Sequence, residues 1–232
     1  MWQSLRRALS AATVVLAATA IPAAPLAAQS TFTDFASFLG AVGPYGVDSF
    51  DDLNEQIGGP LSRAAGGYGY QVAAAAAPLD QFFPVESTDN PGDWWLSEET
   101  AGSGITFSGF DSSIRGIGGF FFATDFNGTP VSLPIFVRAK NVHGAEYTTT
   151  LITTSPDGFF GVVFDDQVAS LFLSPVVISS SIDFHFATVN NLVLAEGATK
   201  VPEPLSAVLL VPGAMLLWRR SRRRNLSAAP HA

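Results

Sequence analysis

The spacing of apolar residues changes from helical to strand-like shortly after the start of the region 33–200. Thr33 is followed by apolar side chains at i, i+3, i+4 and i+7, namely Phe35, Phe38, Leu39 and Val42. This spacing predicts a short amphipathic helix with Thr33 as its N-cap. Gly43-Pro44 is expected to end the helix.

After this helix, short apolar runs alternate with Gly, Pro, Asn and Asp, a pattern typical of antiparallel strands and turns. Pro156-Asp157-Gly158 and Asp125-Phe126-Asn127-Gly128 are predicted to be tight turns. Many short strands at this spacing predict an all-β antiparallel sandwich of the jelly-roll type. The expected strands are 47–53, 68–76, 105–110, 119–126, 135–139, 146–152, 159–164, 169–173 and 182–194.

The 19 phenylalanines of the chain are expected to form the core of this sandwich and not a ligand site. Each buried ring contributes about 1.5–3 kcal/mol. His185 stands between Phe184 and Phe186 in an alternating run, so the pattern predicts that its side chain lies on the surface.

The amino terminus has the order of a secretory signal peptide. Two arginines precede an apolar run, Ala8 to Ile21, and small residues lead to Ala28. The alternative is a first transmembrane helix, but the run is short and Pro22 and Pro25 close it. We therefore predict a signal peptide over residues 1–28, with general secretion favoured over the twin-arginine route that Arg6-Arg7 suggests.

The carboxyl terminus carries a second apolar run, Leu205 to Trp218, behind a Pro-Glu-Pro and ahead of five arginines. Pro202 and Pro204 require any helix to begin after them, and the arginines would stay on the cytoplasmic side of a membrane. This order resembles the PEP-CTERM sorting tail of exported bacterial proteins, which implies an exosortase-type membrane protease as partner. The resemblance assigns the sorting signal to Val201, Pro202, Glu203, Pro204, Arg219 and Arg220.

The apolar run of this tail is short for a permanent membrane span. A helix of 14 residues is roughly 21 Å long, against about 30 Å of hydrocarbon. Pro212 would also kink it. We therefore expect a transient span that is held in the inner membrane until processing, with a sorting tail over 201–224 and a disordered tail over 225–232.

The remaining region, Gln29 to Lys200, has the length of one ordinary domain. It contains nineteen acidic and five basic residues, which gives a net charge near −14. A nucleic-acid partner is therefore not expected, because phosphate binding needs a basic face. The chain has no cysteine, which excludes disulfides, thiol catalysis and thiolate metal sites.

A second resemblance covers roughly Ser49 to Ala195. Its motifs are Phe50-Asp51-Asp52-Leu53, Asp93-Trp94-Trp95-Leu96-Ser97, Ile117-Gly118-Gly119-Phe120-Phe121-Phe122, Asp157-Gly158-Phe159-Phe160-Gly161 and Val189-Asn190-Asn191-Leu192. In this order they resemble the jelly-roll ectodomains that precede PEP-CTERM tails. The resemblance implies a fold and a location outside the inner membrane, at the cell surface or in the extracellular matrix, but no reaction.

No catalytic set is assembled in the sequence, so no enzyme activity and no cofactor are expected. The zinc-protease, nucleophile-elbow and phosphate-loop motifs are absent. The carboxylate doublets Asp51-Asp52, Glu98-Glu99 and Asp165-Asp166 cannot each form a glycosidase pair, because neighbours along a strand point to opposite faces. A structural calcium held by Asp51 or Asp52 with Asn190 is the metal site that the residue types suggest.

Trp94 and Trp95 are the candidate glycan contacts, because flat aromatic faces stack on sugar rings. One of two neighbours in a strand is expected to point inward. The function predicted is that of a non-enzymatic exported surface or matrix protein. The alternatives are a carbohydrate-binding module on exopolysaccharide and, further behind, a polysaccharide-degrading enzyme.

Overall fold

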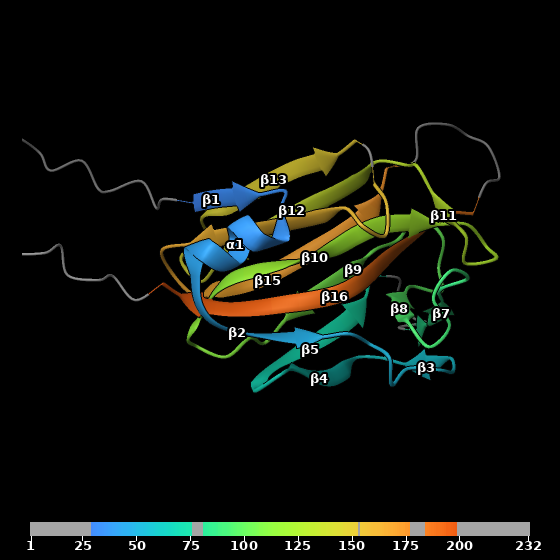
Figure 1. Ribbon diagram of the computed structural model, residues 1–232, viewed down its shortest axis with the longest axis horizontal. Helices are drawn as coiled ribbons and strands as arrows, with labels where there is room; N and C mark the ends of the chain where they lie inside the picture. The colour runs from blue at the N-terminus through green and yellow to red at the C-terminus, as the bar shows by residue number, and fades with distance from the viewer. Residues whose placement is uncertain (1–28, 76–80, 153, 177–183, 199–232) are drawn as a thin grey trace, which may run out of the picture.

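Two antiparallel sheets face each other in the computed structural model, which describes residues 29–75, 81–152, 154–176 and 184–198 (Figure 1). This arrangement confirms the predicted all-β sandwich with one short helix. The expected signal-peptide helix and the C-terminal hydrophobic helix lie outside the described residues. Among the described residues, the structure contains no helix long and apolar enough to cross a membrane.

The larger sheet is ordered β1-β14-β10-β16-β8-β7, with β2 also paired to β16 and β11 to β10. The strand β16 lies between β10 on one side and both β2 and β8 on the other. The bounds are β1 Gln29–Phe32, β2 Val42–Asp48, β7 Val85–Glu86, β8 Trp94–Ser97, β10 Ile114–Thr124, β11 Pro130–Val131, β14 Phe159–Phe164 and β16 Phe186–Gly197.

The second sheet is ordered β13-β12-β15-β9-β5-β4, and a separate short pair joins β3 to β6. Burial alternates along β12, as expected for a strand with one face on the core. The bounds are β3 Ile57–Gly58, β4 Leu61–Ala65, β5 Tyr68–Ala74, β6 Gln81–Phe82, β9 Ile105–Ser108, β12 Ile135–Asn141, β13 Glu146–Leu151 and β15 Val168–Pro175.

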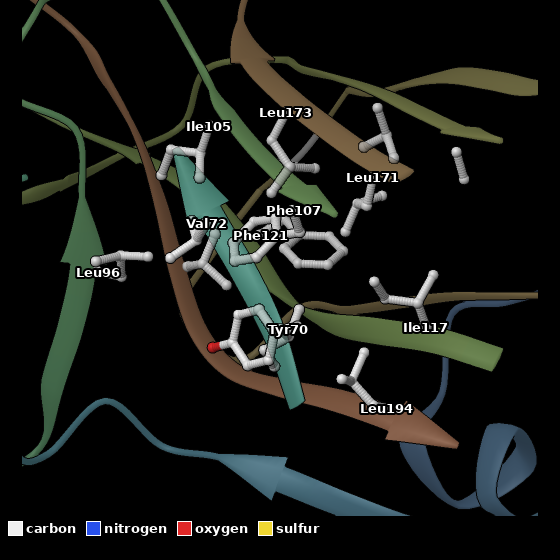
Figure 2. Close-up of a cluster of buried hydrophobic side chains, with 14 of the residues drawn as sticks. Tyr70, Val72, Leu96, Ile105, Phe107, Ile117, Phe121, Leu171, Leu173 and Leu194 are labelled. Atoms are coloured by element: carbon white, nitrogen blue, oxygen red, sulfur yellow. The ribbon is translucent and has the colours of Figure 1, made fainter. Parts of the chain in front are cut away.

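The core lies between the two sheets. Side chains of β5 and β9 meet those of β10 and β16, and Figure 2 shows Tyr70, Val72 and Phe107 close to Phe121 and Leu194. Fully buried phenylalanines include Phe107 and Phe121. The prediction that phenylalanine builds the core therefore holds for most of these residues.

The one helix among the described residues, α1 (Phe35–Ala41), covers the outer face of the larger sheet. Phe38 is fully buried, and its ring centroid is 5.4 Å from that of Phe159 on β14. The predicted helix is confirmed, but its N-cap is wrong. Asp34 and not Thr33 caps the helix, because the Asp34 carboxylate accepts the backbone N–H of Ser37 at 2.8 Å.

Several predicted boundaries shift. The helix ends at Ala41, and Gly43-Pro44, which was expected to end it, lies within β2, which begins at Val42 and stops at Asp48 and not at Leu53. Both predicted turns are present, with Gly158 N–H donating to Ser155 O and Gly128 N–H to Asp125 O, each at 3.0 Å. The strands β1, β4 and β8 and the two-residue strands β3, β6, β7 and β11 were not predicted.

Candidate functional site

Two adjoining hollows lie at the end of the sandwich where β8 and β10 finish and β16 begins, the right-hand end in Figure 1. Their volumes are about 240 and 410 Å³. Both are lined by Glu99, Phe126 and Phe186, so we treat them as one site and call it the Glu99 groove. Its size is in the range of small-molecule and oligosaccharide sites.

Three phenylalanines give the Glu99 groove exposed aromatic surface. Phe126 is 76% exposed at the tip of the turn after β10, Phe184 is 56% exposed just before β16, and Phe83 is 52% exposed just after β6. This corrects the expectation that the phenylalanines are all core. Exposed aromatic rings gathered at one hollow are a common property of binding sites.

Glu98 lies beneath the groove and is 1% exposed. Its Oε2 accepts hydrogen bonds from the Ser103 hydroxyl and the Gly104 N–H, and its Oε1 accepts the Ala187 N–H at 3.2 Å. Burial raises the pKa of the Glu98 carboxyl, and the three donors oppose that rise. Glu98 therefore joins the loop after β8 to the start of β16 and fixes the floor of the groove.

Glu99 also lines the groove and is only partly buried. Its N–H donates to Gln81 O at 3.2 Å, which ties its backbone to β6. Its Oε2 is buried and has no hydrogen-bond partner. A buried carboxylate oxygen without a donor is energetically costly.

Asp125 adds a third carboxylate to the groove. Its Oδ1 accepts the N–H groups of Asn127 and Thr129 at 2.8 and 2.9 Å and so shapes the turn that carries Phe126. Among the described residues that line the two hollows, none is lysine or arginine. The groove therefore combines apolar rings with a negative charge.

The predicted glycan contacts occupy neighbouring positions on β8. Trp95 is 3% exposed, packs edge-to-face on Phe122 at 4.9 Å between centroids, and donates from Nε1 to Asp93 at 3.2 Å. Trp94 is half-buried, and its backbone N–H donates to Asp51 at 3.0 Å. One ring of the pair points inward, as strand geometry requires, and neither residue lines the Glu99 groove.

The residues suggested for calcium are only partly brought together. Asp52 forms an ion pair with Arg63 at 2.7 Å, and Asn190 donates from Nδ2 to Asp93 at 3.2 Å. The carboxylate beside Asn190 is thus Asp93, and no contact joins Asp51 or Asp52 to Asn190 in the described part of the chain. Within those same residues, no three His, Asp or Glu side chains cluster as metal ligands. Calcium binding stays a prediction.

The histidines do not join a catalytic arrangement. His143 is 72% exposed, with its Nε2 3.8 Å from Asp166. The prediction that His185 lies on the surface is wrong, because it is half-buried and its Nδ1 is enclosed. The strand β16 starts only at Phe186 and is buried on both faces for most of its length, so the expected alternation is not observed, and Phe184, which lies before the strand, is exposed.

The predicted sorting residues, Val201 to Pro204 with Arg219 and Arg220, lie outside the described residues. The groove itself was missed by sequence reasoning. One signal was available, since Phe126 stands inside a turn that was predicted, and turn tips are solvent-exposed. No sequence pattern could have predicted the unpartnered Oε2 of Glu99, because its surroundings depend on how β6, β8 and β16 pack together.

No family model matches the chain, and no curated protein matches it. Two solved structures resemble the fold. The CBM22-1 and GH10 modules of a Clostridium thermocellum endo-1,4-beta-D-xylanase, complexed with xylohexaose, align with 11% identity and a TM-score of 0.34, over 57% of this chain and 27% of that chain. The CBM22-1 xylan-binding domain of Paenibacillus barcinonensis Xyn10C aligns with 15% identity and a TM-score of 0.28, over 66% and 94%. The chain thus spans about a quarter of the first structure. The likeness is one of β-sandwich fold.

Proposed function

We propose that this chain is an exported bacterial surface or extracellular-matrix protein whose β-sandwich acts by binding and not by catalysis. The sequence pattern that supports the location is the apolar run behind two arginines in the predicted signal peptide, 1–28, together with the Pro-Glu-Pro, apolar and arginine order of 201–224. The absence of cysteine and the large buried aromatic core agree with a domain stabilised by packing alone.

The carboxylates support binding over catalysis. A glycosidase needs two carboxyl groups that face one cleft across a sugar. Glu98 is enclosed by three donors, and Asp52 is engaged by Arg63. Asp165 and Asp166 line neither hollow of the Glu99 groove. Asp125 lines the groove beside Glu99, but its Oδ1 accepts two backbone N–H groups of its own turn.

Sorting is tested in the host. Glu203→Ala, or deletion of the exosortase, is expected to leave unprocessed protein in the inner membrane, detected by fractionation and immunoblotting. Glu196→Ala serves as the matched control, because it removes an acidic residue outside the Pro-Glu-Pro. Normal processing and release of Glu203→Ala would contradict the sorting proposal.

The second candidate function is carbohydrate binding, and the aromatic rings of the Glu99 groove favour it. Phenyl faces stack on the apolar faces of sugar rings, and carboxylates accept hydrogen bonds from sugar hydroxyls. The test is the affinity of the full-length chain for a panel of bacterial and plant polysaccharides. Phe126→Ala should weaken binding, whereas Tyr45→Ala, which removes another exposed ring 49% accessible on β2, should not. Turnover of a polysaccharide would overturn the non-enzymatic proposal.

A further inference from the structure

The charge of the Glu99 groove restricts what it can bind. Glu98, Glu99 and Asp125 all line it. The four basic side chains of the described residues have partners elsewhere. Arg63 pairs with Asp48, Lys140 with Glu146, Arg138 lies over Phe172 and Arg115 donates to backbone carbonyls. The carboxylates of the groove are therefore not offset by Lys or Arg, and a positive charge on a ligand is favoured.

Glu99 localises this preference. It is the carboxylate that lines both hollows, its side chain is only partly buried, and no donor among the described residues pairs with its Oε2. A protonated amine supplies a donor and a charge together, and a charge-assisted hydrogen bond is about twice as strong as a neutral one. The exposed rings of Phe126 and Phe184 add a surface that attracts cations through their π-faces.

The groove is larger and more aromatic than a bare ammonium ion would need, so the ligand is expected to carry more than the amine. The two hollows measure about 240 and 410 Å³ and carry rings on Phe83 as well as Phe126 and Phe184. A hydroxyl-rich ring with an amine group fills such a space, because its apolar face stacks on phenyl rings and its amine reaches the carboxylate.

We propose that the Glu99 groove binds amino-sugar glycans that carry free, protonated amines, such as a glucosamine polymer, in preference to neutral glycans. This inference rests on the proposed binding function and names its ligand class. Glu99 forms the ion pair with the amine, and Phe126 and Phe184 contact the sugar ring. N-acetylation of the amine removes both the charge and the ion pair.

The experiment compares two oligosaccharides that differ only at nitrogen. Isothermal titration calorimetry of the full-length chain with a glucosamine hexamer and with its N-acetylated counterpart should give at least about tenfold tighter binding of the free amine, since ion-paired hydrogen bonds contribute about 1.5–3 kcal/mol. Glu99→Gln should abolish that preference, because the amide keeps the shape of the side chain and loses the charge.

The matched control separates a site from general attraction between an acidic protein and a cation. Asp157→Asn removes one charge from an exposed turn remote in sequence from the groove and lines neither hollow. It should keep the tenfold preference. Equal losses in Glu99→Gln and Asp157→Asn would overturn the inference, because binding would then follow net charge alone.

The remaining outcomes are distinguishable. Equal affinity for both hexamers, or binding of neutral polysaccharides only, overturns the amine preference and leaves the carbohydrate-binding function standing. Failure to bind any polysaccharide removes both. Binding of oligolysine as tight as that of the glucosamine hexamer also overturns the inference, because the groove would then recognise the amine without the sugar. Circular dichroism confirms that each variant is folded.

Discussion

At the scale of single residues, Asp48 organises the junction between β2, β4 and β5. It is 5% exposed and accepts hydrogen bonds from Arg63 Nη2 at 2.7 Å, Arg63 Nε at 2.8 Å and the Tyr70 hydroxyl at 2.6 Å. Burial and the Asp48 charge together raise the pKa of the Tyr70 hydroxyl. One carboxylate thus compensates a buried cation and a buried phenol.

Asp48→Asn is expected to lower the free energy of unfolding by about 3–5 kcal/mol, because it leaves the Arg63 charge buried without its main partner. The matched control is Asp52→Asn, which also contacts Arg63 but is 70% exposed, and should cost less than about 1 kcal/mol. Urea denaturation of the two variants gives the comparison. Equal losses would mean that burial does not set the strength of these ion pairs.

Glu98 gives a pH dependence with a defined sign. Its pKa is raised in the folded protein, so the folded state binds the proton more tightly than the unfolded state does. The stability that Glu98 contributes is present below its unfolded value of about 4.5 and is lost as the pH rises through the folded pKa.

Unfolding midpoints of the wild type and Glu98→Gln should therefore differ in a pH-dependent way. As the pH rises from about 4.5, the wild type should lose stability relative to Glu98→Gln, which cannot ionise. Urea titrations at several pH values measure this difference. A constant difference between wild type and Glu98→Gln over this pH range would contradict the assignment.

At the scale of elements, the packing of α1 on the larger sheet depends on one residue of β14 that has no side chain, Gly161. A methyl group at Gly161 of β14 would lie 2.6 Å from Cδ2 of Phe38 and 3.0 Å from Cε1 of Phe159. Both rings are buried, so neither can move away freely. The helix can approach the sheet because glycine leaves that space open.

Gly161→Ala is expected to cost about 1–3 kcal/mol through overpacking. Gly40→Ala is the matched substitution within α1, where an added methyl group meets nothing within 4 Å. It should stabilise the protein by up to about 1 kcal/mol through better helix propensity. Thermal unfolding of the two variants tests the prediction. An unchanged melting temperature for Gly161→Ala would show that α1 and β14 accommodate the methyl group without loss of stability.

The elements show what could be predicted from the sequence. The strand β14 has its predicted bounds, Phe159–Phe164, because an apolar run stands between clear turn residues. The strand β10 begins at Ile114 and not at the predicted Gly119, so Gly116 and Gly118 belong to the strand. Residues of adjacent elements pack closely on these glycines, and an added methyl group at Gly118 would lie 2.6 Å from Phe159 Cζ on β14. Tertiary packing overrides local propensity here.

At the scale of the whole molecule, the charge of the domain opposes its compactness. Residues 29–200 carry a net charge near −14. Raising NaCl from 10 to 500 mM should therefore increase the melting temperature by a few degrees, since about 1 kcal/mol of relieved repulsion shifts it by 2–4 °C for a chain of this size. KCl should act equally. No change, or an effect specific to one cation, would contradict simple screening.

The candidate site, unlike the fold, could not be predicted from local sequence patterns. Alternating apolar and polar residues and the turn residues predicted the sandwich, because the burial of each strand is reflected in its own sequence. The Glu99 groove is assembled from the ends of β8 and β10, the start of β16 and the residues beside β6, which are far apart in sequence. No local pattern marks Phe83, Phe126 and Phe184 as neighbours, so the groove could be found only in three dimensions.

The position of β16 has a consequence for the order of synthesis. This last described strand pairs with β10, β2 and β8, which all leave the ribosome earlier. Until residues 186–197 have emerged, the larger sheet lacks its middle and three strands lack a neighbour. A chain interrupted before this point cannot close the sandwich and would expose unpaired strand edges to proteases. The larger sheet is therefore complete only in a chain that extends to the residues preceding Val201.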